Sequence, residues 1–211
     1  MQFIVLTDIF GENAWTQSLQ QSLNAVGKNK NVTVISPYNK PMAFEGEKEA
    51  YQVFVESGGI EAYLKKVETL LANCETQENK VVLGFSAGGA VAWLLAAAAK
   101  RYGLAHVLAF YPGQIRHHLD AVPLCNVDLL FPESEAHFDL TPVIEKLTNK
   151  TNTRCWQNDL AHGYINPESD NYYQSASQQM TRWLSEFAKG NAINLNKEQI
   201  AELERFGYVQ L

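Results

Sequence analysis

Two kinds of hydrophobic pattern alternate along the chain, and each predicts a different element. Short runs rich in apolar, strand-forming residues predict six β-strands, at 3–7, 32–36, 80–84, 105–110, 127–131 and 153–157. Most of these runs lack an in–out alternation, as expected when helices cover both faces of a parallel sheet. Strands that alternate with helices are typical of an α/β fold, so the pattern predicts a mainly parallel sheet of about six strands flanked by helices.

Between these runs, apolar residues recur at the spacing of amphipathic helices. In 58–73 one face collects Ile60, Tyr63, Leu64, Val67, Leu70 and Leu71. Further helices are expected at 13–26, 86–102, 142–148 and 172–189.

The C-terminal segment is predicted to be separate from this pattern. The sequence divides into a domain at 1–190 and a helical tail at 191–211, whose helix is capped near Asn196. Apolar side chains lie on one face of that helix, so it is expected to pack on another surface. Two surfaces stay open: the domain of the same chain, or a neighbouring subunit, which would make a homodimer.

Composition narrows the class of protein. Of the 211 residues 46% are hydrophobic and 19% are charged, which is an ordinary globular balance, and the length suits one sizeable core. The net charge is −6 and no basic stripe is present, so no nucleic-acid partner is expected. The longest apolar run, 90–99, is about half the length needed to cross a bilayer, so no membrane partner is expected.

The N-terminus and the cysteines indicate the compartment. The first residues, "MQFIVLTDIFGEN", lack the layout of a signal peptide. Three cysteines, Cys74, Cys125 and Cys155, suit a reducing compartment better than a disulfide framework. We therefore expect a cytoplasmic protein.

The stretch "GFSAG" carries the most specific chemistry in the chain. It fits the pattern G-x-S-x-G, with a strand before it and an alanine-rich helix after it. In that context a sharp turn exposes the Ser86 hydroxyl, while Gly84 and Gly88 allow the strand and the helix to approach closely. Ser86 is therefore interpreted as a nucleophile, and the alternative is a small residue in an ordinary turn.

A nucleophilic serine needs a base, and His162 is the best candidate. In α/β-hydrolases the chain order is serine, acid, histidine, and His162 lies in a loop after the last predicted strand. His106 lies inside a predicted strand, which favours a core role. The adjacent pair His117 and His118 lacks a third ligand, so no metal is expected.

Three segments resemble the dienelactone hydrolase family of α/β-hydrolases. They are "VLTDIFG" at 5–11, "GFSAGGA" at 84–90 and "AHGYINPESDNYYQSASQQMTRWLSEF" at 161–187. The resemblance implies an oxyanion hole made by the backbone N–H groups of Ile9 and Ala87. It also places Asp8 at an acidic position that can interact with the resting nucleophile.

The same resemblance implies an acid in the loop after 127–131. That loop reads "FPESEAHFD", and aligning Pro132 with the family's glycine makes Glu135 the acid of the triad. Glu133 and Asp139 are the alternatives. Residues Phe10, Phe44, Tyr111 and Tyr164 are candidate walls of the substrate pocket.

The chain also departs from the family. The founding enzymes use a cysteine nucleophile and bind the substrate's carboxylate with arginine, whereas this chain has Ser86 and no arginine just after His162. Arg116 is a candidate near the mouth of the site, with a surface role as its alternative. The chain begins at the strand before the turn that contains Asp8 and Ile9, called the oxyanion turn. The family's leading strands are therefore expected to be absent.

These observations predict a serine hydrolase that cleaves a small carboxylic ester, which includes lactones and thioesters as options. Its partner is the small-molecule substrate, and no metal or organic cofactor is expected. Two alternatives stay open: a non-catalytic binding protein on the same fold, and an acyltransferase or peptidase that uses the same triad.

Overall fold

The computed structural model describes residues 1–26, 31–74, 79–190 and 192–211. Its described residues form a seven-stranded sheet in the order β2-β1-β3-β4-β5-β6-β7. The strands are β1 (Gln2–Leu6), β2 (Asn31–Ile35), β3 (Lys80–Phe85), β4 (Leu104–Phe110), β5 (Asn126–Phe131), β6 (Thr153–Gln157) and β7 (Val209–Gln210). The first six strands are parallel, and each lies within one residue of its predicted run. The mainly parallel α/β fold is therefore confirmed.

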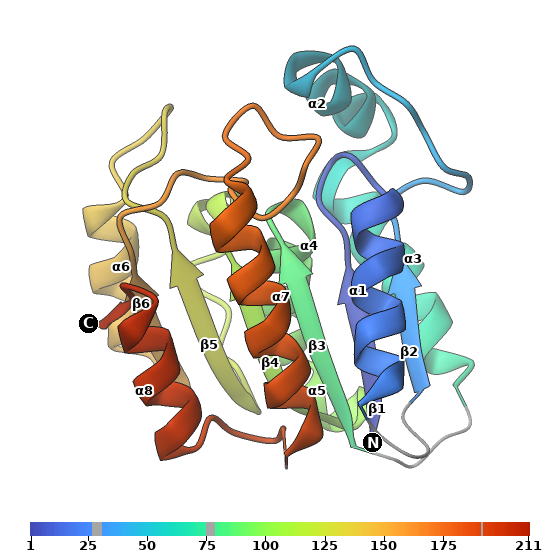
Figure 1. Cartoon of the computed structure of the whole chain (residues 1–211). Coiled ribbons are helices and arrows are strands. Elements are labelled where there is room, and N and C mark those ends of the chain that lie inside the picture. The colour runs from blue at the N-terminus through green and yellow to red at the C-terminus, as the bar shows by residue number, and fades with distance from the viewer. Residues whose placement is uncertain (27–30, 75–78, 191) are drawn as a thin grey trace.

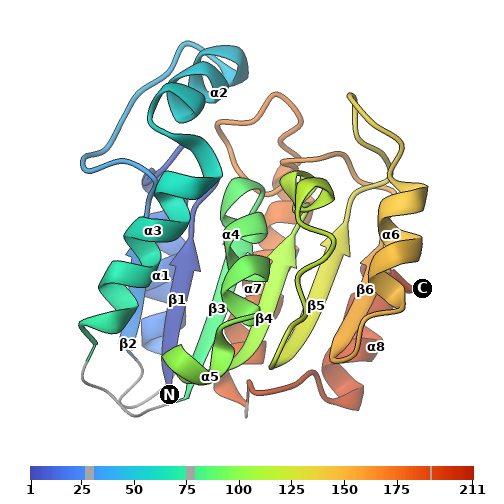
Figure 2. The same cartoon turned by 180° about the vertical axis from the view of Figure 1, so that it is seen from behind.

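Helices cover both faces of the sheet. Figure 1 shows α1 (Ala14–Ala25), α7 (Gln174–Lys189) and α8 (Lys197–Arg205) on one face. Figure 2 shows α3 (Gly59–Ala72), α4 (Ala87–Ala96), α5 (Ala99–Tyr102) and α6 (Thr141–Thr148) on the other face. Each face carries its own cluster of buried apolar side chains. This two-sided burial explains why the strand sequences are apolar throughout.

The structure differs from the predicted helices at two places. The helix α2 (Glu47–Glu56) was not predicted, and it lies above the carboxyl end of the sheet (Figure 1). Only Ala50 and Phe54 of α2 are buried, so its hydrophobic pattern is weak. The predicted helix at 86–102 divides into α4 and α5, because the Ala96 carbonyl accepts a hydrogen bond from Leu124 N instead of continuing the helical ladder. No described helix is long and apolar enough to cross a membrane.

The C-terminal tail packs on the domain of its own chain. Its helix α8 is capped by Asn196, as predicted, and Leu203 is fully buried. The strand β7 then pairs antiparallel with β6, which makes a seventh strand where about six were expected. β7 was not predicted, because a strand of only two residues leaves no periodic pattern in the sequence. Pairing with β7 covers the carboxyl end of the β6 edge, at Trp156 and Gln157.

A buried charge cluster attaches the start of the tail to the sheet. The carboxylate of Asp128, on β5, accepts hydrogen bonds from His106 on β4 at 2.7 Å and from Arg154 on β6 at 2.7 and 2.8 Å. The other ring nitrogen of His106 lies 2.9 Å from the Ala192 carbonyl, and Arg154 also donates to the Asn194 side chain. Both ring nitrogens of His106 therefore have an oxygen partner within hydrogen-bond distance.

These contacts determine the charge state of Asp128. Burial alone raises the pKa of its carboxyl, but the hydrogen bonds from His106 and Arg154 outweigh burial and hold the pKa below its usual value. His106 therefore has the core role expected from its position in a strand.

Asp128→Asn should lower the free energy of unfolding by about 3 kcal/mol or more, because it leaves the buried His106 and the partly buried Arg154 without the carboxylate that both contact. Chemical denaturation at neutral pH measures this loss. Asp120→Asn is the control, because Asp120 is almost fully exposed and forms a surface ion pair with Lys146. An equal effect of the two substitutions would contradict the assignment of Asp128 as an anchor.

Candidate active site

Ser86 lies at a sharp turn between β3 and α4. Its backbone has φ 50° and ψ −110°, a left-handed conformation that is unusual for any residue other than glycine. The turn is held on one side by the hydrogen bond from Ser86 N to the Phe110 carbonyl. On the other side Gly88 is essential, because a Cβ atom there would lie 2.3 Å from the Leu6 carbonyl oxygen. The turn presents a partly exposed Ser86 hydroxyl at the carboxyl edge of the sheet.

His162 reaches this hydroxyl from the loop between β6 and α7. Its Nε2 atom lies 2.8 Å from Ser86 Oγ. The loop is held in place by Ser177 Oγ, which donates to the Ile165 carbonyl, and by Asn171 Nδ2, which donates to the His162 carbonyl. The side chain of His162 is 24% exposed, so a substrate can approach the imidazole from solvent.

Glu135 lies on the other side of His162, in the loop after β5. Its Oε1 atom is 2.9 Å from His162 Nδ1. The glutamate side chain rests against Gly113, where a Cβ atom would lie 2.8 Å from Oε1. The two alternatives from the sequence point elsewhere: Glu133 is exposed, and Asp139 is exposed and accepts from Thr141 N at the start of α6. Ser86, His162 and Glu135 therefore form a continuous hydrogen-bonded series.

The turn after β1, which contains Ile9, emerges at the same edge of the sheet as Ser86, because β1 pairs in parallel with β3. In the described part of the chain, neither Ile9 N nor Ala87 N has a hydrogen-bond acceptor. The peptide that follows Ile9 is fixed because Tyr38 donates to the Ile9 carbonyl at 2.6 Å. Ala87 N is the first amide of α4, and such amides carry partial positive charge. Both predicted oxyanion donors are thus free to receive an oxygen.

Asp8 belongs to the turn after β1, immediately before Ile9, and is 4% exposed. Its carboxylate accepts from Phe10 N at 3.0 Å and from Asn166 Nδ2 at 2.7 Å. Burial raises the pKa of Asp8 to about 6, although these two hydrogen bonds and the charge of His162 lower it. The Ser86 hydroxyl is bonded to His162 and not to Asp8.

The predicted pocket residues lie at different depths. Tyr111 and Tyr164 are each 1% exposed and pack behind the imidazole, with the Tyr111 ring centroid 4.9 Å from that of His162. Their rings are in contact with each other at 5.8 Å. Phe10 lies in the turn after β1, where its ring contacts the partly buried Phe44.

Arg116, the candidate cation near the mouth, has local partners. Its guanidinium donates to the Gly113 carbonyl at 2.7 Å and lies over the Phe138 ring at 4.6 Å. These contacts link the turn after β4 to the loop that carries Glu135. Arg116 therefore has a position that supports the Glu135 loop.

Sequence reasoning missed several residues that support the site. Asn166 contacts Asp8, and Asn13, the first residue of the helix predicted at 13–26, contacts Asn166. Tyr208 of the tail places its hydroxyl 3.2 Å from that of Tyr164. The only signal for Asn166 was its place four residues after His162, in the segment that resembles the family.

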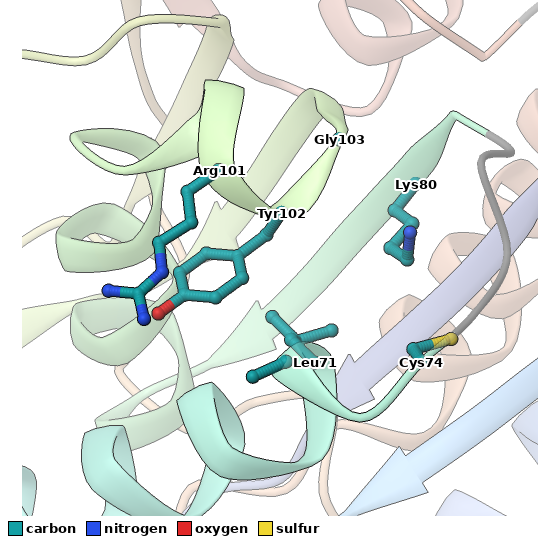
Figure 3. A pocket seen from close by; sticks show the side chains of 7 residues that line it. Leu71, Cys74, Lys80, Arg101, Tyr102 and Gly103 are labelled. Carbon is teal, nitrogen blue, oxygen red and sulfur yellow. The ribbon is translucent and has the colours of Figure 1, made fainter.

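A separate cavity of about 430 Å³ lies far from Ser86, at the amino ends of β3 and β4. Figure 3 shows Lys80 and Arg101 beside it, together with the Tyr102 hydroxyl and the Cys74 thiol. Because Ser86 follows the carboxyl end of β3 and Lys80 begins that strand, the cavity and the hydroxyl lie at opposite edges of the sheet.

Comparisons with known proteins identify a family and a curated relative. The family model of the dienelactone hydrolase family matches residues 3–189. A curated relative, the uncharacterized protein YczH of Bacillus subtilis, is 29% identical over 171 residues, which cover 79% of this chain and 81% of YczH.

Solved structures share the fold at low sequence identity. A dienelactone hydrolase-like promiscuous phosphotriesterase from metagenomic libraries has a TM-score of 0.65 at 13% identity, covering 89% of this chain and 84% of its own. Est1E from Butyrivibrio proteoclasticus has a TM-score of 0.58 at 12% identity, covering 95% and 88%. Dienelactone hydrolase from Anabaena variabilis has a TM-score of 0.56 at 15% identity, covering 88% and 85%. The family match spans most of the chain, and the chain therefore belongs to the dienelactone hydrolase family, a family of carboxylic-ester hydrolases within the α/β-hydrolase superfamily.

Proposed function

We propose that this protein hydrolyses small, neutral carboxylic esters through a covalent acyl-enzyme on Ser86. The observation that supports the proposal most strongly is the series from Ser86 Oγ to His162 Nε2 and from His162 Nδ1 to Glu135, at 2.8 and 2.9 Å. These are hydrogen-bond distances for a nucleophile, a base and an orienting acid. Lactones and thioesters react by the same route and are the finer substrate classes to test.

In the proposed mechanism, Ser86 Oγ attacks the ester carbonyl carbon while His162 Nε2 takes the hydroxyl proton. The carbonyl oxygen becomes an oxyanion, which the N–H groups of Ile9 and Ala87 stabilise. Glu135 stabilises the imidazolium and fixes the orientation of its ring. Collapse of the tetrahedral intermediate releases the alcohol, which takes the proton from His162 and leaves an acyl group on Ser86.

The second half of the reaction repeats these roles with water. His162 removes a proton from a water molecule as the water oxygen attacks the acyl carbon. The second tetrahedral intermediate collapses, Ser86 recovers its proton from His162, and the carboxylic acid leaves. An acyltransferase would use an alcohol or amine in place of this water, and product analysis with added acceptors separates the two outcomes.

A fluorophosphonate probe should label wild-type protein at a single residue, Ser86, identified by intact mass and peptide mapping. Ser86→Ala should abolish labelling, and His162→Ala should slow it by about a hundredfold or more, since the general base is lost. Failure of the folded wild type to react would favour the non-catalytic binding protein.

Gly113→Ala should lower kcat by about tenfold, because the new methyl group would displace the Glu135 carboxylate from His162. Glu135→Gln should lower kcat by about a hundredfold or more, since the amide cannot stabilise the imidazolium in the same way. Steady-state kinetics with a neutral ester measures both effects.

The matched control is Gly46→Ala, where no atom lies within 4 Å of the added Cβ and the backbone is extended. Its kcat should equal that of wild type. A Gly113→Ala variant with full activity would argue against Glu135 as the acid.

Neutral esters should be cleaved faster than matched esters that carry a carboxylate. Asp8 and Glu135 are acidic groups near His162. No arginine follows His162 closely in the sequence, and the fourth residue after it is Asn166, which contacts Asp8. Repulsion of about 1–2 kcal/mol should make kcat/KM about 5- to 30-fold lower for 4-nitrophenyl hemisuccinate than for 4-nitrophenyl butyrate. Each rate is divided by that of hydroxide-catalysed hydrolysis, and a preference for the anionic ester would refute this substrate class.

A further inference from the structure

We infer that the hydrogen bond between Asp8 and Asn166 is a tie that joins the oxyanion turn to the loop carrying His162, called the histidine loop. Asn166 is thereby a positioning residue for catalysis. This inference rests on the proposed function, because it concerns the alignment of the Ile9 N–H group with His162. It differs from the role that the family resemblance implies for the acidic residue at position 8, which is contact with the resting nucleophile.

The two residues belong to loops that are far apart in sequence. Asp8 immediately precedes Ile9 in the turn after β1, and Asn166 lies four residues after His162 in the loop before α7. Their side chains meet at 2.7 Å, and both residues are buried, at 4% and 0% exposure. This hydrogen bond therefore joins the segment that carries the oxyanion donor to the segment that carries the base.

Every polar atom of the tie is used, which fixes its orientation. One Asp8 oxygen accepts from Phe10 N and the other accepts from Asn166 Nδ2. The Asn166 oxygen accepts from Glu168 N at 3.1 Å and from Asn13 Nδ2 at 2.9 Å. Since a backbone N–H can only donate and a carboxylate can only accept, the Asn166 amide has a single orientation that satisfies both.

Asn13 extends the tie to a rigid element. Its side-chain oxygen accepts from Thr16 N and caps α1, while its nitrogen donates to Asn166. These hydrogen bonds therefore connect both the oxyanion turn and the histidine loop to the N-terminus of α1. Catalytic groups held in this way keep their geometry, and a misplacement of about 1 Å can cost about a hundredfold in rate.

The arrangement allows a test in which the charge is moved rather than removed. In Asp8→Asn the two amide nitrogens face each other, and in Asn166→Asp the two carboxylates face each other. In the double variant Asp8→Asn/Asn166→Asp, the amide at position 8 still accepts from Phe10 N and donates across the gap. The carboxylate at position 166 then accepts from position 8, from Asn13 and from Glu168 N.

Kinetics at pH 8 with a neutral ester should separate the variants. Each single substitution should lower kcat by about 30-fold with KM changed less than about threefold, because the tie acts on alignment rather than on substrate binding. The double variant should recover kcat to within about threefold of wild type. Asn24→Asp adds the same charge at an exposed position of α1 and is the control, expected to match wild type.

Two results would overturn the inference. One is full kcat in Asn166→Asp. The other is a double variant no more active than the poorer single variant, which includes the case in which a carboxylate is needed at position 8 itself.

If the wild type hydrolyses no ester and reacts with no probe, the proposed function fails but the tie does not. Amide hydrogen exchange then tests the tie independently of activity. The single variants should then show faster exchange in both 7–13 and 160–173, and the double variant should restore protection. Unchanged exchange in the single variants would defeat the tie.

Discussion

The parallel pairing of β1, β3, β4, β5 and β6 is the constraint on which the whole site depends. Because these strands run in one direction, the segments that follow all five emerge at the same edge of the sheet. The oxyanion turn follows β1, Ser86 follows β3, Gly113 follows β4, Glu135 follows β5 and His162 follows β6. Five segments separated by long stretches of sequence thus meet around one hydroxyl.

The left-handed turn at Ser86 is the most demanding point of this arrangement. A non-glycine residue at positive φ carries local strain of about 1–3 kcal/mol, so the surroundings must hold it in place. Those surroundings are the tight contact at Gly88 and the hydrogen bond to Phe110. Strain at such a position is common where a side chain must be exposed for chemistry.

The aromatic side chains next to His162 connect the histidine loop to the C-terminal tail. Tyr111 packs against the imidazole, Tyr164 packs against Tyr111, and the hydroxyls of Tyr164 and Tyr208 lie 3.2 Å apart. The tail lies outside the residues matched by the family model, and the Asp128 cluster and β7 hold it on the sheet. Residues added beyond the family domain are therefore part of the support of the histidine loop.

The sequence predicted the parts of this structure that depend on local pattern. Six apolar runs became six parallel strands, and "GFSAG" became the strand–turn–helix at Ser86. Only alignment to a family pattern distinguishes Glu135 from Glu133 and Asp139 as the expected acid, because the position of a residue within a loop leaves no periodic signal in the sequence. The sequence could not show that Gly113 makes room for Glu135, that Asn166 meets Asp8 across 158 positions, or that β7 would pair with β6, since these are contacts between segments that only the fold brings together.

In the proposed mechanism, ester cleavage passes through an acyl group on Ser86. Rapid-quench mass spectrometry with an activated neutral ester detects that acyl group. The acyl mass should appear on the peptide containing Ser86 at least as fast as steady-state turnover, then decay to free acid. Ester hydrolysis with no acylated protein, or with acylation at another residue, would contradict this mechanism.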